Sequence, residues 1–270
     1  MADSEVRPAV LPAPRALLSR DSIVAWSILL LLTVLAWLVT THRAGAMGSG
    51  TGTMGLSFAL FVAFWITMMA AMMLPSVAPI AIAWARAIGR QSSGLRRTSR
   101  TTQFLAGYLL AWAAFGCLAY AGLALLERTL RMSPEVGRWV GLAAFAAAGL
   151  QQLGPLKDVC LRHCRSPFAQ LLHYAQFRGW SRDLRVGVHH GSYCVGCCWG
   201  LMVLLVPLGV MNIAAMAAIA AVIFLEKLWR RGPMLARISG VAFLALAALA
   251  PFQPWLLPGI TSPGPMEVMP

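Results

Sequence analysis

The sequence predicts an all-α protein, a polytopic bundle of transmembrane helices. Hydrophobic residues make up 59% of the 270 residues, charged residues make up 11%, and the mean hydropathy is +0.71. Soluble domains, by contrast, contain about 25% charged residues. About seven apolar runs, each long enough for a membrane-crossing helix, follow one another along the chain. Lys and Arg occupy the short gaps between these runs, so the net charge of +13 indicates orientation in a lipid bilayer and no nucleic-acid partner.

The first apolar run, Ile23–Thr40, follows a segment rich in Pro, Ala and Arg over residues 1–21, for which we expect a flexible cytoplasmic tail. No convincing small-residue cleavage site follows the run, so we expect an anchor rather than a signal peptide. Charges, Gly or Pro bound the later runs, which are Leu56–Ile88, Phe104–Leu126, Val136–Leu153, Val188–Val210, Met211–Trp229 and Leu235–Pro251. Only a PLGVMN turn separates the fifth run from the sixth, so six or eight spans remain alternatives. The transmembrane domain is therefore expected over residues 22–257, and an external tail over residues 258–270.

The basic residues divide unequally between the two sides of the predicted bundle. Of the 22 Lys and Arg residues, 18 fall before the first run or in the gaps that lie on the same side, and 4 fall on the other side. Because cytoplasmic loops carry an excess of Lys and Arg, this division places the N-terminus in the cytoplasm and the C-terminus outside. We therefore expect a multi-pass protein of the bacterial cytoplasmic (inner) membrane, with a Cys- and His-rich cytoplasmic loop at residues 154–193.

Five of the six cysteines lie between residues 160 and 198. Cys160 and Cys164 are one helical turn apart, and Cys194, Cys197 and Cys198 share one arc of a second helix. Thiolates that face a reducing compartment are expected to stay reduced and to bind a soft metal. A short helix from Ser166 to Gly179 would fold the loop back, so that both clusters close on one ion. His163 lies between two of these cysteines and is a further candidate ligand that needs a bend in its helix.

A second candidate feature is the methionine face of the second run. Met68 and Met72 form one row and Met69 and Met73 form another on the same side of a helix. Methionine in lipid commonly serves packing, which is the alternative interpretation. Pro75 and Pro79 deprive two carbonyls of their helical partners, and a helix broken beside four thioethers suggests a path for a soft ion.

Three polar residues are expected near the cytoplasmic ends of their spans: Gln151, Gln152 and Glu226. They lie on the side of the cysteine clusters, where each could be a ligand or could hydrogen-bond a ligand from behind. For Glu226, pairing with Lys227 or with water is the favoured interpretation.

Three stretches resemble an uncharacterised bacterial family of predicted metal-binding integral membrane proteins. They are WITMMAAMMLPSVAP from Trp65, PLKDVCLRHCRSP from Pro155 and CVGCCWGLM from Cys194. The resemblance covers most of the chain beyond the first run. It implies a polytopic topology and a metal site at these cysteines.

Together these features predict an integral membrane protein that binds a soft transition metal, with Cu(I) favoured over Zn(II). Its role would be metal transport, or delivery to a copper-dependent membrane enzyme or metallochaperone. Motifs typical of hydrolases and ATPases are absent from the sequence, so catalysis is not expected. A membrane thiol–disulfide redox protein and a structural subunit of a membrane complex are the alternatives.

Overall fold

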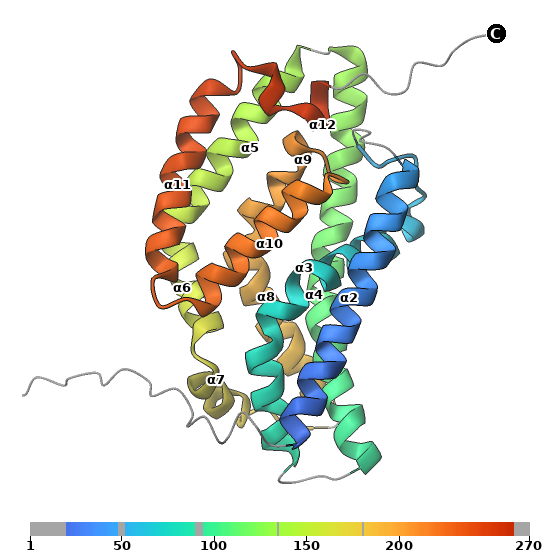
Figure 1. Ribbon diagram of the computed structural model, residues 1–270, viewed down its shortest axis with the longest axis vertical. Coiled ribbons are helices and arrows are strands. Elements are labelled where there is room, and N and C mark those ends of the chain that lie inside the picture. The colour runs from blue at the N-terminus through green and yellow to red at the C-terminus, as the bar shows by residue number, and fades with distance from the viewer. Residues whose placement is uncertain (1–19, 48–51, 90–93, 134, 180, 262–270) are drawn as a thin grey trace, which may run out of the picture.

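The computed structural model describes residues 20–47, 52–89, 94–133, 135–179 and 181–261, and the regular structure within these ranges is helical. Long helices lie side by side along the long axis (Figure 1). They are α2 (Arg20–Met47), α3 (Phe58–Gly89), α4 (Gly94–Met132), α5 (Val136–Leu153), α8 (Arg182–Val203), α10 (Ile213–Leu228) and α11 (Gly232–Leu249). Each predicted apolar run thus forms a helix. The all-α prediction is confirmed for the described residues.

Five of these helical segments are long and apolar enough to cross a membrane, which indicates a membrane protein. They are Ala25–Gly45, Phe58–Gly89, Gly94–Met132, Arg182–Leu208 and Gly232–Leu249. The other two predicted runs fall short of such a span. The helix α10 has 16 residues, and α5, with 18 residues, carries Arg138 and the pair Gln151–Gln152. The count of seven spans is therefore not confirmed.

The direction of the helices alternates along the chain. Figure 1 places the start of α2 and the α3–α4 connection at the lower end of the molecule, and the α10–α11 connection higher up, beside α6. The α2–α3, α4–α5 and α9–α10 connections lie in the upper half, where α9 is Leu205–Leu208. The gaps that are rich in Lys and Arg therefore lie below the other connections. The side of the membrane that this end faces stays a prediction.

The expected Cys- and His-rich loop is largely helical. It contains α6 (Pro155–Arg165), α7 (Pro167–Tyr174) and the first half of α8. Ser166 occupies the N-cap of α7 as predicted, although its side chain makes no capping hydrogen bond. The helix α7 ends at Tyr174, before the predicted Gly179, and α6 packs against α8. Two short helices and a turn thus bring the first cysteine cluster back to the second.

The two predicted tails lie mostly outside the described residues. The predicted cytoplasmic tail lies almost wholly outside the described residues, because the description begins at Arg20. Residues 258–261 of the predicted external tail form α12 (Pro258–Thr261), which packs against α9 after the short 3-10 helix η1 (Pro254–Leu256). The rest of that tail, residues 262–270, lies outside the described part of the chain.

Close contact between α4 and α8 fixes the position of the helix that carries three cysteines. A Cβ atom at Gly107 would lie 2.1 Å from the carbonyl oxygen of Leu184, and one at Gly187 would lie 2.1 Å from that of Phe104. Only glycine at both positions allows the two backbones to approach this closely. The helix α8 is therefore held at the centre of the bundle, with more than half of its apolar span buried.

Candidate metal site

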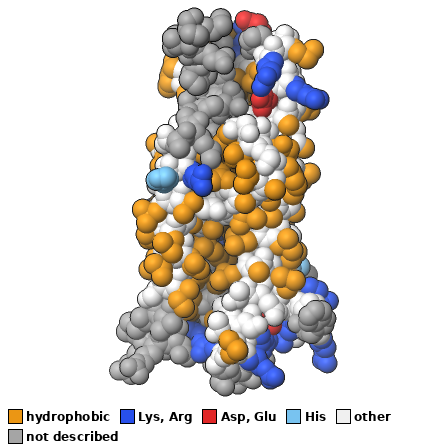
Figure 2. Space-filling view, turned by 90° about the vertical axis from the view of Figure 1, so that its right-hand side faces the viewer, with side chains coloured by type: hydrophobic (Ala, Val, Ile, Leu, Met, Phe, Trp, Pro, Cys, Tyr) orange, Lys and Arg blue, Asp and Glu red, His pale blue; other side chains and the backbone are white. Residues whose placement is uncertain are grey.

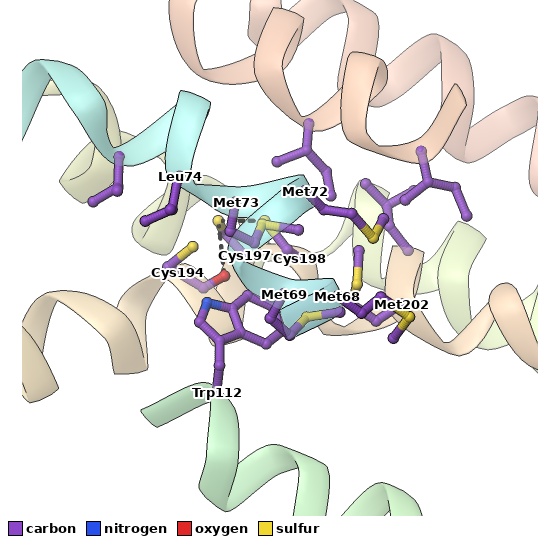
Figure 3. Packing of buried hydrophobic residues seen from close by; sticks show 14 of the residues in the cluster. Met68, Met69, Met72, Met73, Leu74, Trp112, Cys194, Cys197, Cys198 and Met202 are labelled. Atoms are coloured by element: carbon purple, nitrogen blue, oxygen red, sulfur yellow. Dashed lines mark hydrogen bonds between the residues drawn. The ribbon is translucent and has the colours of Figure 1, made fainter. Parts of the chain in front are cut away.

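The central feature of the bundle is a group of three cysteines on α8. The Sγ atoms of Cys194, Cys197 and Cys198 all lie within 4.8 Å of one another, and the three side chains are 0–1% exposed. The Sγ atoms of Cys197 and Cys198 are 3.1 Å apart. Figure 3 shows this group facing the methionines of α3. The spacing i, i+3, i+4 predicted the shared arc.

Cys164 of α6 joins this group, whereas Cys160 does not. The distance from Cys164 Sγ to Cys197 Sγ is 3.9 Å. Cys160 is buried against Gly196, where an added Cβ atom would lie 2.9 Å from its Sγ atom. Burial raises the pKa of the Cys160 thiol, which disfavours the thiolate. The structure therefore brings the two clusters together through Cys164, while Cys160 packs beside them.

The methionine face of α3 covers the cysteine group. Met68, Met69, Met72 and Met73 are each 0–1% exposed and belong to the same packed cluster as the three cysteines. Figure 3 shows their side chains between α3 and α8, with Met202 of α8 beside them. The prediction that these four side chains share one side of a helix agrees with this arrangement. They pack against the cysteine group, and their use as a path for an ion stays a prediction.

The prediction of a broken helix beside these methionines is wrong. The helix α3 continues from Phe58 to Gly89 with Pro75 and Pro79 inside it. A proline removes one backbone donor, and the other hydrogen bonds of a long buried helix suffice to continue it. The Ser76 hydroxyl also donates to the carbonyl oxygen of Met73 at 2.9 Å, which provides a polar contact within this turn.

A lysine from a third helix, α10, also contacts the sulfur group. Lys227 of α10, 7% exposed, donates to Cys194 Sγ at 2.9 Å and to Ser76 Oγ at 3.2 Å. The hydroxyl of Tyr108 of α4 lies 3.1 Å from the same Sγ atom. A cation beside a sulfur stabilises the thiolate, which is the form of cysteine that binds metals. Cys194 is therefore the cysteine with the most polar surroundings in this group.

A buried ion pair supports the backbone of the cysteine helix. The Nζ atom of Lys157 of α6 lies 2.6 Å from Oε2 of Glu226 of α10, and the two side chains are 0% and 1% exposed. Lys157 also donates to the carbonyl oxygen of Cys197 at 2.8 Å, and Gln152 donates to Glu226 at 2.6 Å. Burial alone would lower the pKa of Lys157, but the Glu226 carboxylate and the neighbouring cysteines raise it. The expected pairing of Glu226 with Lys227 is wrong, because Lys227 turns to the sulfur group and Glu226 turns to α6.

Gln151 acts on the same helix turn. Its side-chain amide donates at 3.1 Å to the carbonyl oxygens of both Gly196 and Cys197. Two side chains, Gln151 and Lys157, thus donate to the turn of α8 that presents Cys197 and Cys198. Gln152 instead donates to Glu226, the partner of Lys157, and to Ser239.

Most of the chain matches a known protein family. The family model PpoB2, described as a copper chaperone, matches residues 62–250. The chain belongs to the PpoB2 copper chaperone family. The matched stretch contains every methionine, cysteine and histidine that the sequence analysis nominated. No curated protein and no solved structure matches the chain.

His163 lies apart from the sulfur group of this copper chaperone family member. Its ring stacks on Tyr193 with centroids 3.8 Å apart, and its Nε2 atom lies 3.0 Å from the Tyr174 hydroxyl. Burial, with His189 and His173 nearby, lowers the pKa of His163 to about 4, so the ring is neutral at pH 7. Among the described residues, the group of mutually close donor atoms comprises the three cysteines of α8. The helix α6 is continuous from Pro155 to Arg165, so His163 lies on a different side of it from Cys160 and Cys164.

Lys157 and Lys227 are the residues of the site that sequence reasoning missed. Lys157 was counted only as a basic residue of the predicted loop, and Lys227 was considered only as a partner of Glu226. A signal was present at Lys227, because Glu226 and Lys227 interrupt an otherwise apolar run. Neighbouring residues on a helix point about 100° apart, so the two side chains reach different partners.

Proposed function

We propose that this copper chaperone family member holds Cu(I) in a sulfur site inside the bundle and delivers the ion to a copper-dependent enzyme. The proposed thiolate ligands are Cys164, Cys194, Cys197 and Cys198. The proposed thioether ligands are Met68, Met69, Met72 and Met73, which take part in transfer. Cys160 packs against the site, and His163 forms part of the adjoining aromatic group.

The observation that carries this proposal is the group of three mutually close cysteine sulfurs on α8, with a fourth sulfur, from Cys164 of α6, in contact with Cys197. A metal–sulfur bond to a thiolate is about 2.3 Å long, so two sulfurs on one ion are at most about 4.6 Å apart. The distances of 3.1 Å for Cys197–Cys198 and 3.9 Å for Cys164–Cys197 fall inside this limit. Small side-chain movements therefore suffice to load an ion.

The donor set also supports Cu(I) over Zn(II). Thiolates and thioethers are soft ligands, and thioethers have little affinity for zinc. A methionine sulfur is neutral, so it binds without the proton loss that a thiol requires. A site with strong thiolates and adjoining weaker thioethers suits an ion that must leave again.

The proposed setting is the bacterial cytoplasmic membrane, with the end that carries α6 and α7 in the cytoplasm. The unequal distribution of Lys and Arg supports this orientation. Copper would then be acquired from the cytoplasmic side, from a metallochaperone or a reduced thiol carrier. The recipient would be a copper enzyme that meets this protein in or at the membrane.

Elemental analysis and transfer together test the proposal. The purified protein should bind Cu(I) at a defined stoichiometry and pass it to an apo copper enzyme faster than free copper loads in the presence of a competing chelator. Retention of zinc but not copper would contradict the assignment of the metal. Binding without transfer would contradict the role in delivery.

The same preparation tests the redox alternative, which the 3.9 Å distance from Cys164 to Cys197 keeps relevant. A redox relay should form a disulfide between these cysteines under mild oxidation and turn over with an external thiol or quinone. A copper site should instead lose thiol reactivity when Cu(I) is added and recover it when a chelator removes the ion.

A further inference from the structure

A cavity that is separate from the sulfur group lies at the end of the molecule that holds α7. Its volume is about 710 Å³, and it lies between the start of α4 and the connection from α7 to α8. Figure 2 shows Lys and Arg side chains gathered at this lower end. The cavity is lined by Arg96, Arg100, Gln103, Ala175, Phe177, Arg178, Gly179, Arg182 and Asp183.

Among the described lining residues, positive charges outnumber negative ones. Asp183 is the one acidic side chain among the described lining residues, and it is 4% exposed. Arg100 contacts both of its carboxylate oxygens, with Nε at 2.8 Å from Oδ2 and a terminal nitrogen at 3.3 Å from Oδ1. The negative charge of Asp183 is therefore already matched. The positive charges of Arg96, Arg178 and Arg182 remain.

Arg182 has a buried donor that no described residue satisfies. Its guanidinium lies 5.3 Å from the centroid of the Trp84 ring, and one terminal nitrogen donates to the Tyr174 carbonyl oxygen at 3.4 Å. Its Nε atom is buried and has no hydrogen-bond partner among the described residues. Buried donors in native proteins are nearly always satisfied, by protein, water or ligand. Trp84 holds this donor in place without satisfying it.

We propose that this cavity binds a phosphate group through Arg96, Arg178 and Arg182. The planar guanidinium matches the geometry of phosphate oxygens and stays charged in partly buried surroundings. Basic pockets between helices at the edge of a membrane bind phospholipid headgroups. The cavity borders the ends of the apolar segments of α4 and α8, so a headgroup could enter it while its acyl chains remain in the bilayer. The two sources of this chemistry are an anionic phospholipid and free inorganic phosphate.

The test uses the full-length protein in nanodiscs of phosphatidylcholine, with or without phosphatidylglycerol. Lipid that stays bound after detergent extraction is counted by mass spectrometry. The wild-type protein should retain phosphatidylglycerol in preference to phosphatidylcholine. Arg178→Gln, at an exposed position, and Arg182→Gln should each reduce that retention severalfold. Arg231→Gln, an exposed arginine of the α10–α11 connection outside the cavity, is the matched control and should retain the lipid as the wild type does.

A competition experiment distinguishes the two sources. If millimolar inorganic phosphate displaces phosphatidylglycerol from the wild type, and the arginine variants lose phosphate binding, free phosphate also occupies the cavity. If phosphate has no effect while the variants lose the lipid, the ligand is the headgroup. Equal retention of lipid by the wild type and both cavity variants, with no phosphate binding, would overturn the proposal. Helical content and copper stoichiometry should be unchanged in all variants, which separates this test from that of the sulfur site.

Discussion

Cys164 Sγ of α6 lies 3.9 Å from Cys197 Sγ of α8, although the two residues are 33 positions apart in the chain. This contact joins the two cysteine clusters into one group. It depends on the packing of α6 against α8, with glycine at position 196 beside Cys160. A single shared metal site is the consequence that we test first.

Replacing Cys164 by Ser should weaken Cu(I) binding about as much as replacing Cys197 by Ser. Each change removes one thiolate from a shared site, and total binding energies of structural zinc sites with thiolate ligands, taken as a guide, are about 10–16 kcal/mol. A loss of several kcal/mol corresponds to a weakening of at least about 100-fold. The measurement is competition with a Cu(I) chelator of known affinity. Cys160→Ser is the matched control, because Cys160 lies one turn away on the same helix, and it should bind nearly as tightly as the wild type. Two independent ions, one for each cluster, would contradict the shared site.

The Lys157–Glu226 pair should show strong coupling in a double-mutant cycle. Lys157→Met leaves a buried carboxylate without its cation, and loss of one partner of a buried pair costs about 3–5 kcal/mol of stability. Adding Glu226→Gln removes that charge and should recover a large part of the loss. The free energy of unfolding is measured by denaturant titration of the purified protein. Additive effects of the two changes would show that the pair is not coupled.

The close contact of α4 and α8 predicts a sharp difference between two glycines. Gly187→Ala places a Cβ atom 2.1 Å from the Phe104 carbonyl oxygen, so the helices must separate and carry the cysteines with them. We expect a destabilisation of about 1–3 kcal/mol or more, with reduced copper binding. Gly122→Ala is the control, since a Cβ atom there meets no other atom within 4 Å. Equal melting temperatures for the two variants would show that the contact is looser than described.

Much of the fold follows from the sequence because apolar length and helical spacing are local properties. The seven apolar runs and the shared arc of Cys194, Cys197 and Cys198 needed no knowledge of which helices pack together. The partners of Lys157, Glu226 and Lys227 could not be found in this way. They depend on how α6 and α10 are placed around α8, which is set by packing across distant segments. Sequence adjacency favoured a Glu226–Lys227 pair, and the geometry of the helix excluded it.

The continuity of α3 is a second feature that local sequence rules did not predict. Proline at positions 75 and 79 predicts a local defect in the helix. Such a rule takes no account of the neighbouring helices that pack against α3. Likewise, five segments meet the length and hydropathy of a membrane span. The roles of α5 and α10 in the bilayer depend on their neighbours and not on their own sequences alone.

The orientation of the bundle can be tested with two engineered cysteines at opposite ends. Leu95 at the start of α4 is 86% exposed, and Met132 at its end is 85% exposed. Because the gaps rich in Lys and Arg lie toward the end that holds Leu95, we expect Met132→Cys to react with an impermeant maleimide in intact cells. Leu95→Cys should react only after the cells are permeabilised. The unmodified protein provides the background, and the opposite labelling pattern would invert the proposed orientation.

The methionines around the cysteine group should govern transfer more than binding. Leucine keeps nearly the volume of methionine at a repacking cost typically under about 1.5 kcal/mol, and it removes the sulfur. Met68→Leu combined with Met72→Leu should therefore leave the protein folded and its copper content at equilibrium nearly unchanged, because the cysteines remain. The rate of copper transfer to an apo enzyme should fall by about tenfold. This corresponds to about 1.4 kcal/mol of lost transition-state stabilisation, because a thioether that binds copper during transfer is no longer present. Met211→Leu, which replaces a buried methionine at the turn before α10, is the matched control and should transfer at the wild-type rate. If the double variant also transfers copper at that rate, the methionine face of α3 serves packing alone, and the four cysteines account for the site without it.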